Sequence, residues 1–326
     1  MTVFGFHASH EQASPRQLLQ DVHAAERAGF AAAMCSDHLA PWSRRQGHSG
    51  FAWSWLGAAL AGTGMRMGVV TAPGQRYHPV ILAQASATLA QMFPGRFWMA
   101  PGSGENLNEH VTGDPWPDKE DRQLRLEECV EVIRRLHRGD TVDHRGRITV
   151  DRARIWDLPP TPVPLIAPAL SPETAARSAA WADGLITVNQ PLDDLRTVLE
   201  AYRGQGGTGP AVLQVHLSWA PTRAESERIA VDQWRSNTVP RHQLEDLART
   251  EDFEAASAGA GLDEVAQAVD VSADPHWHVE RLAEYAGLGF DEVYLHCVAQ
   301  DQGPFIETFG REVLPALAGL TTEANP

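Results

Sequence analysis

Two short polar stretches follow apolar runs and carry side chains that can move protons. The first is Ser36-Asp37-His38-Leu39-Ala40-Pro41-Trp42, which places a carboxylate, an imidazole and an indole within seven residues. Histidine has an unperturbed pKa near ~6.5, so His38 is a natural proton acceptor at neutral pH that a neighbouring carboxylate can orient. A histidine at a strand end is also often a structural hydrogen-bonding group. Trp42 can cover a planar ligand or belong to the core.

The second stretch is Pro101-Gly102-Ser103-Gly104-Glu105-Asn106-Leu107-Asn108-Glu109. Its two glycines let backbone amides approach a ligand, Ser103 adds a hydroxyl donor, and Glu105 is expected to point into the barrel mouth where a helix begins. Tight strand-to-helix turns also use glycine for steric reasons alone. The interpretation of this stretch as part of a binding site is strengthened because a barrel would place it opposite the His38 stretch.

A third stretch, Val69-Val70-Thr71-Ala72-Pro73-Gly74, can form a bulge or a strained peptide beneath a ring, or a plain turn. A metal site is not expected, because His7-Ala8-Ser9-His10 lacks the close H-x-H spacing that a metal hydrolase would need on its first strand.

Short apolar runs alternate with amphipathic segments along the chain, as in repeated βα units. Eight strands are predicted, near Val3–His7, Ala32–Ser36, Met67–Thr71, Phe97–Pro101, Pro164–Ala169, Gly184–Val188, Val212–Trp219 and Glu292–Cys297. Between them, apolar residues at helical spacing are expected to pack outside a barrel. These residues are Leu18, Leu19, Val22 and Ala25, then Ile81, Ala85, Leu89 and Met92, then Leu126, Val130, Ile133 and Leu136.

This pattern predicts a (β/α)₈ TIM barrel forming one domain over residues 1–320, followed by a tail over 321–326. Two segments interrupt the rhythm. Residues 140–162 are expected to form a hairpin and loop after strand four, and residues 236–270 an additional helical segment after strand seven. In such barrels the catalytic groups stand at the carboxyl ends of the strands, where the polar stretches lie.

The charge and cysteine content narrow the classes of partner. A formal net charge of −15 argues against nucleic-acid or anionic-membrane binding, which requires clustered cations, and Lys119 is the only lysine. Cys35, Cys129 and Cys297 lie far apart, so no disulfide framework or zinc clip is expected. No leader-like or membrane-spanning segment is recognisable, so a cytoplasmic protein is expected.

Four motifs in order along the chain carry a resemblance to a known family. They are Ser36-Asp37-His38 with Trp42, Arg76-Tyr77-His78-Pro79 leading to Ala83-Gln84-Ala85, Gly102-Ser103-Gly104-Glu105 with Asn108-Glu109, and Gly289-Phe290-Asp291-Glu292-Val293-Tyr294. Together they resemble the F420-dependent glucose-6-phosphate dehydrogenase-like branch of the luciferase-like superfamily. The resemblance implies a flavin or deazaflavin ring held across the strand ends, and a homodimer.

The resemblance also implies residue roles. His38 would be the active-site base, Glu105 the acid, and Trp42 a neighbour of the reacting ring carbon. The resemblance implies cofactor contacts for Asp37, Ser103, Gly104 and Asn108, with a strained peptide around Val70–Thr71. Where the branch has a Gly-Gly turn for the cofactor phosphate, this chain reads Pro168-Ala169-Leu170-Ser171-Pro172. Ala169, Leu170 and Ser171 are therefore expected at the phosphate, with the helix amides and the Ser171 hydroxyl as donors.

Departures from the branch bear on substrate and cofactor. The branch holds a sugar phosphate with lysines and an arginine in its second half, whereas this chain has no lysine after Lys119 and no arginine in Ala266–Ser272. Glucose 6-phosphate is therefore not expected as the substrate. The runs Phe4–Gln12 and Gly47–Trp55 are closer to a sister group that uses an ordinary flavin. F420 and FMN consequently remain open as cofactors.

Three functions are compatible with these residues. The first is hydride transfer between the cofactor and a small, neutral, partly apolar substrate, with His38 taking the substrate proton and Glu105 supplying one to the ring. The second is an FMN-dependent monooxygenase that uses molecular oxygen, served by a separate flavin reductase. The third is a flavin-binding barrel without catalysis, which fold alone does not exclude.

Overall fold

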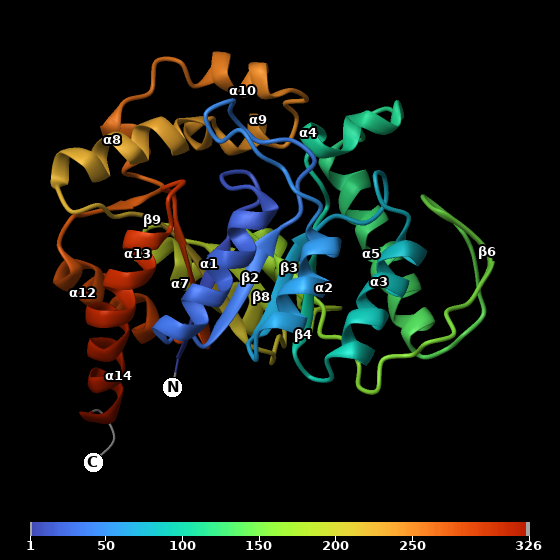
Figure 1. Ribbon diagram of the computed structural model, residues 1–326. Coiled ribbons are helices and arrows are strands. Elements are labelled where there is room, and N and C mark those ends of the chain that lie inside the picture. The colour runs from blue at the N-terminus through green and yellow to red at the C-terminus, as the bar shows by residue number, and fades with distance from the viewer. Residues whose placement is uncertain (1, 324–326) are drawn as a thin grey trace.

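Eight parallel strands form a nearly closed barrel in the computed structural model, which describes residues 2–323 (Figure 1). The neighbour order is β4-β3-β2-β1-β11-β9-β8-β7. A backbone bridge between Met99 and Leu165 connects β4 to β7. All eight predicted strands are confirmed, with ends shifted by two residues or fewer. They are β1 (Val3–Ala8), β2 (Ala32–Ser36), β3 (Arg66–Thr71), β4 (Phe97–Pro101), β7 (Ile166–Pro168), β8 (Gly184–Val188), β9 (Ala211–Ser218) and β11 (Glu292–Cys297).

Large aromatic side chains fill the barrel where glycines face them. Trp98 on β4 and Tyr294 on β11 are fully buried in the barrel interior, with ring centroids 5.9 Å apart. A Cβ built on Gly68 would overlap the Trp98 indole, and one built on Gly5 would press on the Tyr294 ring. Both glycines are thus required by close packing across the barrel, since protein interiors leave no room for an extra methyl group.

Helices surround the barrel and begin at the signals that the sequence carries. Ser14, Ser171 and Asp274 cap helices whose first turn contains proline, the residue favoured at that position. The helices are α1 (Pro15–Ala28), α2 (Ala52–Gly62), α3 (Pro79–Met92), α4 (Asn106–Glu109), η1 (His110–Thr112), α5 (Lys119–His137), α6 (Pro172–Ser178), α7 (Leu192–Gly204), α8 (Arg223–Trp234), α12 (Pro275–Gly287), α13 (Gly303–Thr308), η3 (Phe309–Val313) and α14 (Leu314–Glu323). Helix α14 therefore continues into the segment expected as a tail, of which residues 324–326 lie outside the described part.

The stripe expected on α3 was partly wrong. Ile81 and Met92 are 54% and 56% exposed, and the buried face instead includes Leu82, Ser86 and Leu89. Because α3 carries apolar residues on nearly all sides, periodicity alone did not single out the face that packs on the barrel. The stripes on α1 and α5 are confirmed, except that Leu19 is only partly buried.

Two segments add to the barrel. Residues 140–162 contain an antiparallel hairpin of β5 (Val142–Arg145) and β6 (Thr149–Ala153). Between α8 and α12 the chain forms η2 (Arg235–Thr238), α9 (Arg241–Leu244), α10 (Thr250–Ala256), α11 (Leu262–Val265) and β10 (Asp270–Val271). Figure 1 shows α8, α9 and α10 over the end of the barrel where α4 also lies. We refer to residues 235–265 as the lid. Among the described residues, no helix has the length and apolar character needed to cross a membrane.

Candidate active site

The loop that follows β2 is fastened on both sides, which fixes His38. The backbone carbonyl of His38 accepts a hydrogen bond from Ser49 Oγ (2.7 Å), and Asn108 Oδ1 accepts from the amide of Leu39 (2.8 Å). Further along, Arg44 pairs with Glu251 on α10 (2.6 Å), and Thr250 Oγ1 donates to the carbonyl of Pro41 (2.7 Å). The loop therefore joins β2 to the lid.

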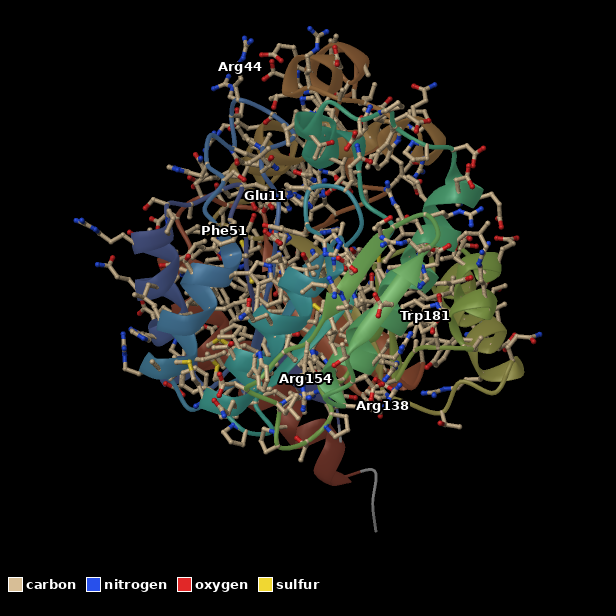
Figure 2. The ribbon with its side chains drawn as sticks, turned by 90° about the vertical axis from the view of Figure 1, so that its right-hand side faces the viewer. Glu11, Arg44, Phe51, Arg138, Arg154 and Trp181 are labelled. Atoms are coloured by element: carbon tan, nitrogen blue, oxygen red, sulfur yellow. The ribbon has the colours of Figure 1, made fainter. Side chains whose placement is uncertain are left out.

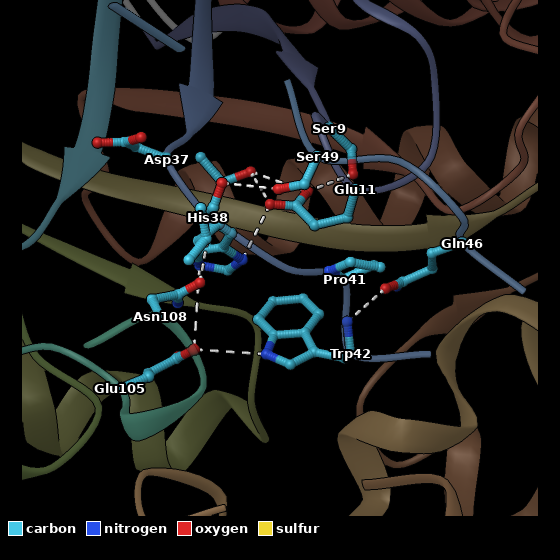
Figure 3. A network of polar contacts seen from close by, with 12 residues as sticks. Ser9, Glu11, Asp37, His38, Pro41, Trp42, Gln46, Ser49, Glu105 and Asn108 are labelled. Carbon is cyan, nitrogen blue, oxygen red and sulfur yellow. Dashed lines mark hydrogen bonds and ion pairs between the residues drawn. The ribbon is translucent and has the colours of Figure 1, made fainter. Parts of the chain in front are cut away.

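The structure brings together the three residues predicted to be catalytic (Figure 3). His38 Nε2 lies 4.0 Å from Glu105 Oε2, and Trp42 Nε1 donates to the same Glu105 oxygen at 3.4 Å. The Trp42 ring meets the His38 ring edge-on, with centroids 4.7 Å apart. An imidazole and a carboxyl group thus face one space beside an indole.

Glu11 completes this group, and the sequence analysis assigned it no role. Its carboxylate lies 2.9 Å from His38 Nδ1 and accepts hydrogen bonds from the hydroxyls of Ser9 and Ser36, each at 2.7 Å. Figure 2 shows Glu11 inside the molecule, whereas Arg44 lies near the lid end of the periphery. Glu11 follows β1 by three residues, so the rule applied to strands two and four would have found it on strand one.

The charges on Glu11 and His38 stabilise one another. Burial raises the pKa of Glu11, but the His38 charge and the serine hydroxyls outweigh it and hold that pKa well below its usual range. Burial lowers the pKa of His38, but the contact with Glu11 and the nearby Glu105 raise it to about 9. His38 is therefore protonated at neutral pH in the free protein. A neighbouring carboxylate was expected to orient His38, and in the structure that carboxylate belongs to Glu11.

The pKa of Glu105 is shifted in the opposite direction from that of Glu11, since burial raises it despite the nearby His38 charge. A carboxyl group with a raised pKa keeps its proton more readily than one in water. This suits the proton-donating role predicted for Glu105.

Asp37 uses its carboxylate within the protein. The carboxylate accepts hydrogen bonds from Trp53 Nε1 (3.1 Å), Thr71 Oγ1 (2.7 Å) and the Tyr77 hydroxyl (3.1 Å), and the residue is only 3% exposed. Figure 3 shows Asp37 pointing away from the Glu11–His38 contact. Its side chain ties β2, β3 and α2 together at the mouth of the barrel.

The turn after β4 presents backbone to the mouth. Ser103 and Gly104 are partly buried, and Gly104 has a positive φ of 91°. A Cβ there would lie 3.1 Å from Glu109 Cγ, so glycine is favoured by conformation and by space. Gly102 hydrogen-bonds to the Thr71 carbonyl and lies against Pro168 of β7. Gly102 and Gly104 would therefore offer backbone, with no intervening side chain, to a planar flavin-type ring bound at this end of the barrel.

The strand beneath this turn is regular, which favours the plain turn over the bulge or the strained peptide that the resemblance implies at Val70–Thr71. Val70 pairs with Ser36 and Ala100, and Thr71 pairs with Pro101. Among the described residues there is no cis peptide bond, and neither Val70 nor Thr71 has a positive φ. Pairing with strands on both sides keeps this backbone extended.

The turn expected at a cofactor phosphate follows β7. Ala169 is buried, Leu170 is 41% exposed, and Ser171 caps α6 by accepting a hydrogen bond from the Thr174 amide (3.4 Å). The Ser171 hydroxyl also donates to Thr174 Oγ1 at 3.3 Å. Within the free protein, this hydroxyl is therefore already engaged at the helix end.

A second polar group lies in the barrel on the side of β1, β9 and β11. The His7 and His296 rings stack at 4.3 Å, and Trp234 packs on His216 and His296, with centroids 4.7 Å apart in each case. Burial lowers the pKa of His7 and of His216 to about 3, so both imidazoles are neutral at physiological pH.

Comparison with known proteins adds to this geometry. The luciferase-like monooxygenase family matches residues 1–292. Proteins named F420-dependent glucose-6-phosphate dehydrogenase, from Beutenbergia cavernae and Nakamurella multipartita, are each 34% identical, with 97% of this chain covered and 98% and 97% of theirs. An F420-dependent secondary alcohol dehydrogenase, solved with an F420–acetone adduct, superposes with a TM-score of 0.89 at 27% identity, covering 97% and 99% of the two chains. A tetrahydromethanopterin reductase from Methanopyrus kandleri shares the fold at 20% identity and a TM-score of 0.75.

Proposed function

The chain belongs to the luciferase-like monooxygenase family of oxidoreductases, and from this premise we propose that it is an F420-dependent oxidoreductase that interconverts a small alcohol and its carbonyl compound. The single observation that carries the proposal is the group of Glu11, His38, Glu105 and Trp42 at the mouth of the barrel. It contains a proton-transferring pair beside an indole, and the oxidation of an alcohol by hydride transfer needs a group that takes up the hydroxyl proton.

When bound, a deazaflavin would supply the hydride acceptor or donor. The residues expected to hold its ring are Gly102, Ser103 and Gly104 on the β4 side, with Ala169–Ser171 toward its phosphate. Asn108 supports this arrangement by fixing the His38 loop, and Asp37 by joining β2 to β3.

His38 handles the proton on the substrate oxygen. When the alcohol is oxidised, a neutral His38 accepts that proton, and Glu11 stabilises the imidazolium that results. When the carbonyl is reduced, the protonated His38 returns it. Glu105, with its raised pKa, handles the proton on the cofactor side, and the Trp42 indole keeps the Glu105 carboxyl group oriented.

We further propose that glucose 6-phosphate is not the substrate, although several relatives are named for that activity. The support is the chain itself, which has no lysine after Lys119 to pair with a phosphate dianion.

The proposal is tested by anaerobic titration of the cofactor-free protein with F420 and with FMN, followed by F420 reduction in the presence of 2-propanol, 2-butanol and glucose 6-phosphate. Tight F420 binding and reduction by the neutral alcohols are expected. Preferential FMN binding, with oxygen uptake when reduced FMN is supplied, would instead identify a monooxygenase.

We also propose a homodimer that associates through α2 and α3. Neither helix contains a charged residue, although the chain carries a net charge of −15, and Ile81 and Met92 are exposed on α3. An uncharged face with exposed apolar side chains is typical of a protein interface.

A further inference from the structure

Four consecutive residues, at the end of α8 and the start of the lid, have buried polar atoms without partners. They are Trp234 Nε1, Arg235 Nε, Ser236 Oγ and Asn237 Nδ2. The indole and guanidinium nitrogens only donate hydrogen bonds, and so does the amide nitrogen. Buried donors are normally satisfied, because leaving them without an acceptor is costly. A run of such groups points to an acceptor that is supplied from outside the chain.

This segment lies beside the proposed reaction centre. The Trp234 ring meets the Trp42 ring edge-on, with centroids 5.7 Å apart, and Trp42 donates to Glu105. Val239, which follows η2, belongs to the cluster in which Leu107 and Phe253 pack against Trp42. The unpartnered donors are therefore attached to a segment that packs against Trp42 through residues at both of its ends.

Arg235 differs from the arginines around it. Arg223 pairs with Glu227, Arg228 with Glu225, and Arg249 with Asp252, whereas Arg235 forms no ion pair with any described residue. The Nε atom of Arg235 is also buried without a hydrogen-bond partner. Arg235 and its neighbours are thus available for an anionic group.

We infer that the substrate carries a carboxylate, bound by Arg235, while its secondary alcohol or ketone carbon lies at His38. One guanidinium matches the single charge of a carboxylate, and it can donate two parallel hydrogen bonds to the two oxygens. The inference rests on the proposed function and narrows it to hydroxy acids and oxo acids.

The step that this substrate undergoes is balanced without another reactant. With F420 bound, the carbinol C–H bond would break and its hydride would pass to the cofactor, and the O–H proton would pass to His38 as the carbon becomes a ketone. Glu105 would supply the proton that the ring takes up with the hydride. The carboxylate remains unchanged at Arg235. In the reverse direction, an oxo acid takes up the same hydride and proton.

The test compares 3-hydroxybutyrate with 2-butanol, which lacks the carboxylate, and with glucose 6-phosphate, in the wild type and in Arg235→Met. The matched control is Arg249→Met, which removes a lid arginine that is already paired with Asp252. We expect 3-hydroxybutyrate to have the highest kcat/KM. Arg235→Met should raise the KM for 3-hydroxybutyrate by about 10- to 100-fold with little change in kcat, and it should leave the kinetics with 2-butanol unaffected. Arg249→Met should not show this increase in KM.

A second measurement needs no turnover. In thermal unfolding without F420, 3-hydroxybutyrate should raise the Tm of the wild type and of Arg249→Met but not that of Arg235→Met. Equal kcat/KM for 3-hydroxybutyrate and 2-butanol, with no effect of Arg235→Met, would overturn the carboxylate site and leave the dehydrogenase intact. Preference for the phosphate ester would also overturn it. If no alcohol reduces F420, the proposed function fails, while the Tm comparison still decides the carboxylate site.

Discussion

Glu11 and His38 are coupled so closely that the pH dependence of catalysis should belong to the pair. With the His38 pKa raised to about 9, kcat/KM for alcohol oxidation should increase with pH and level off near that value. In Glu11→Gln the stabilising charge is absent, so the apparent pKa should fall toward the unperturbed value of ~6.5. Parallel pH–rate profiles measure both values. An unchanged profile in Glu11→Gln would show that Glu11 does not set the protonation of His38.

His38 itself should be needed for turnover but not for cofactor binding. His38→Ala should lower kcat by about 10²- to 10⁴-fold, the range for loss of a general acid–base group, and leave the F420 Kd within about tenfold. Fluorescence titration and stopped-flow F420 reduction separate the two effects. His48→Ala is a suitable control, because His48 is an exposed residue near the same loop. Retention of turnover in His38→Ala would remove His38 from the mechanism.

At the level of single residues, the sequence predicted the polar side chains that directly follow strands two and four. It did not predict Glu11, the carboxylate that contacts His38. His38, Trp42 and Glu105 come together as expected because strand ends meet at one mouth. Glu11 was missed because the strand-end rule was not applied to β1, and its contact with His38 joins two segments that lie 27 residues apart in the sequence. The raised pKa of His38 follows from that three-dimensional contact and has no local signal in the sequence.

Among the elements, β3 and β4 depend on the close approach of Gly68 to the Trp98 indole, which a single added methyl group should disrupt. Gly68→Ala would place a Cβ inside the Trp98 indole, and overpacking of a filled interior typically costs about 1–3 kcal/mol. Gly57→Ala on α2 is the matched control, because a Cβ there meets no atom within 4 Å. Urea unfolding should show a lower midpoint for Gly68→Ala alone. Equal midpoints for the two variants would show that the indole can move aside.

The strands could be predicted almost completely, whereas the surface of α3 could not. Buried parallel strands are short, apolar and bounded by turn residues, which makes them recognisable one at a time. On α3, Ile81 and Leu82 are equally apolar, and only the position of the barrel decides that Leu82 is buried. The sequence left the end of β3 open between a bulge and a plain turn for a related reason, since its regular backbone is imposed by its neighbours β2 and β4.

For the whole molecule, the buried neutral histidines should lower the free energy of unfolding as the pH becomes acidic. The pKa of His7 and of His216 is about 3 in the folded protein and ~6.5 when unfolded, so the unfolded state binds more protons between these values. Their effect is absent above pH ~6.5 and grows as the pH falls, reaching on the order of 2 kcal/mol per histidine at pH ~5. Urea unfolding at a series of pH values measures this. His216→Gln should flatten the dependence, and an unchanged slope would exclude His216 as a cause.

The proposed homodimer can be tested by a substitution on the uncharged face of α2 and α3. Ile81→Glu should shift sedimentation from dimer to monomer, because a buried, unpaired carboxylate is strongly unfavourable at an interface. Trp156→Glu is the control, since Trp156 is 81% exposed beyond the β5–β6 hairpin. Dissociation by Trp156→Glu alone would place the interface at the hairpin. A monomeric wild type would remove the homodimer altogether.

Trp42 belongs both to the reaction centre and to the packing of the lid. Its indole contacts His38 and Glu105, and it also packs in the cluster of Leu107, Val239 and Phe253. Divergence in this lineage would therefore be constrained. A new lid that accepts a different compound also repositions a catalytic neighbour, so turnover and substrate range should change together rather than separately. For protein engineering, a lid grafted from a relative should work best when the β2 loop from Leu39 to Gln46 is transplanted with it.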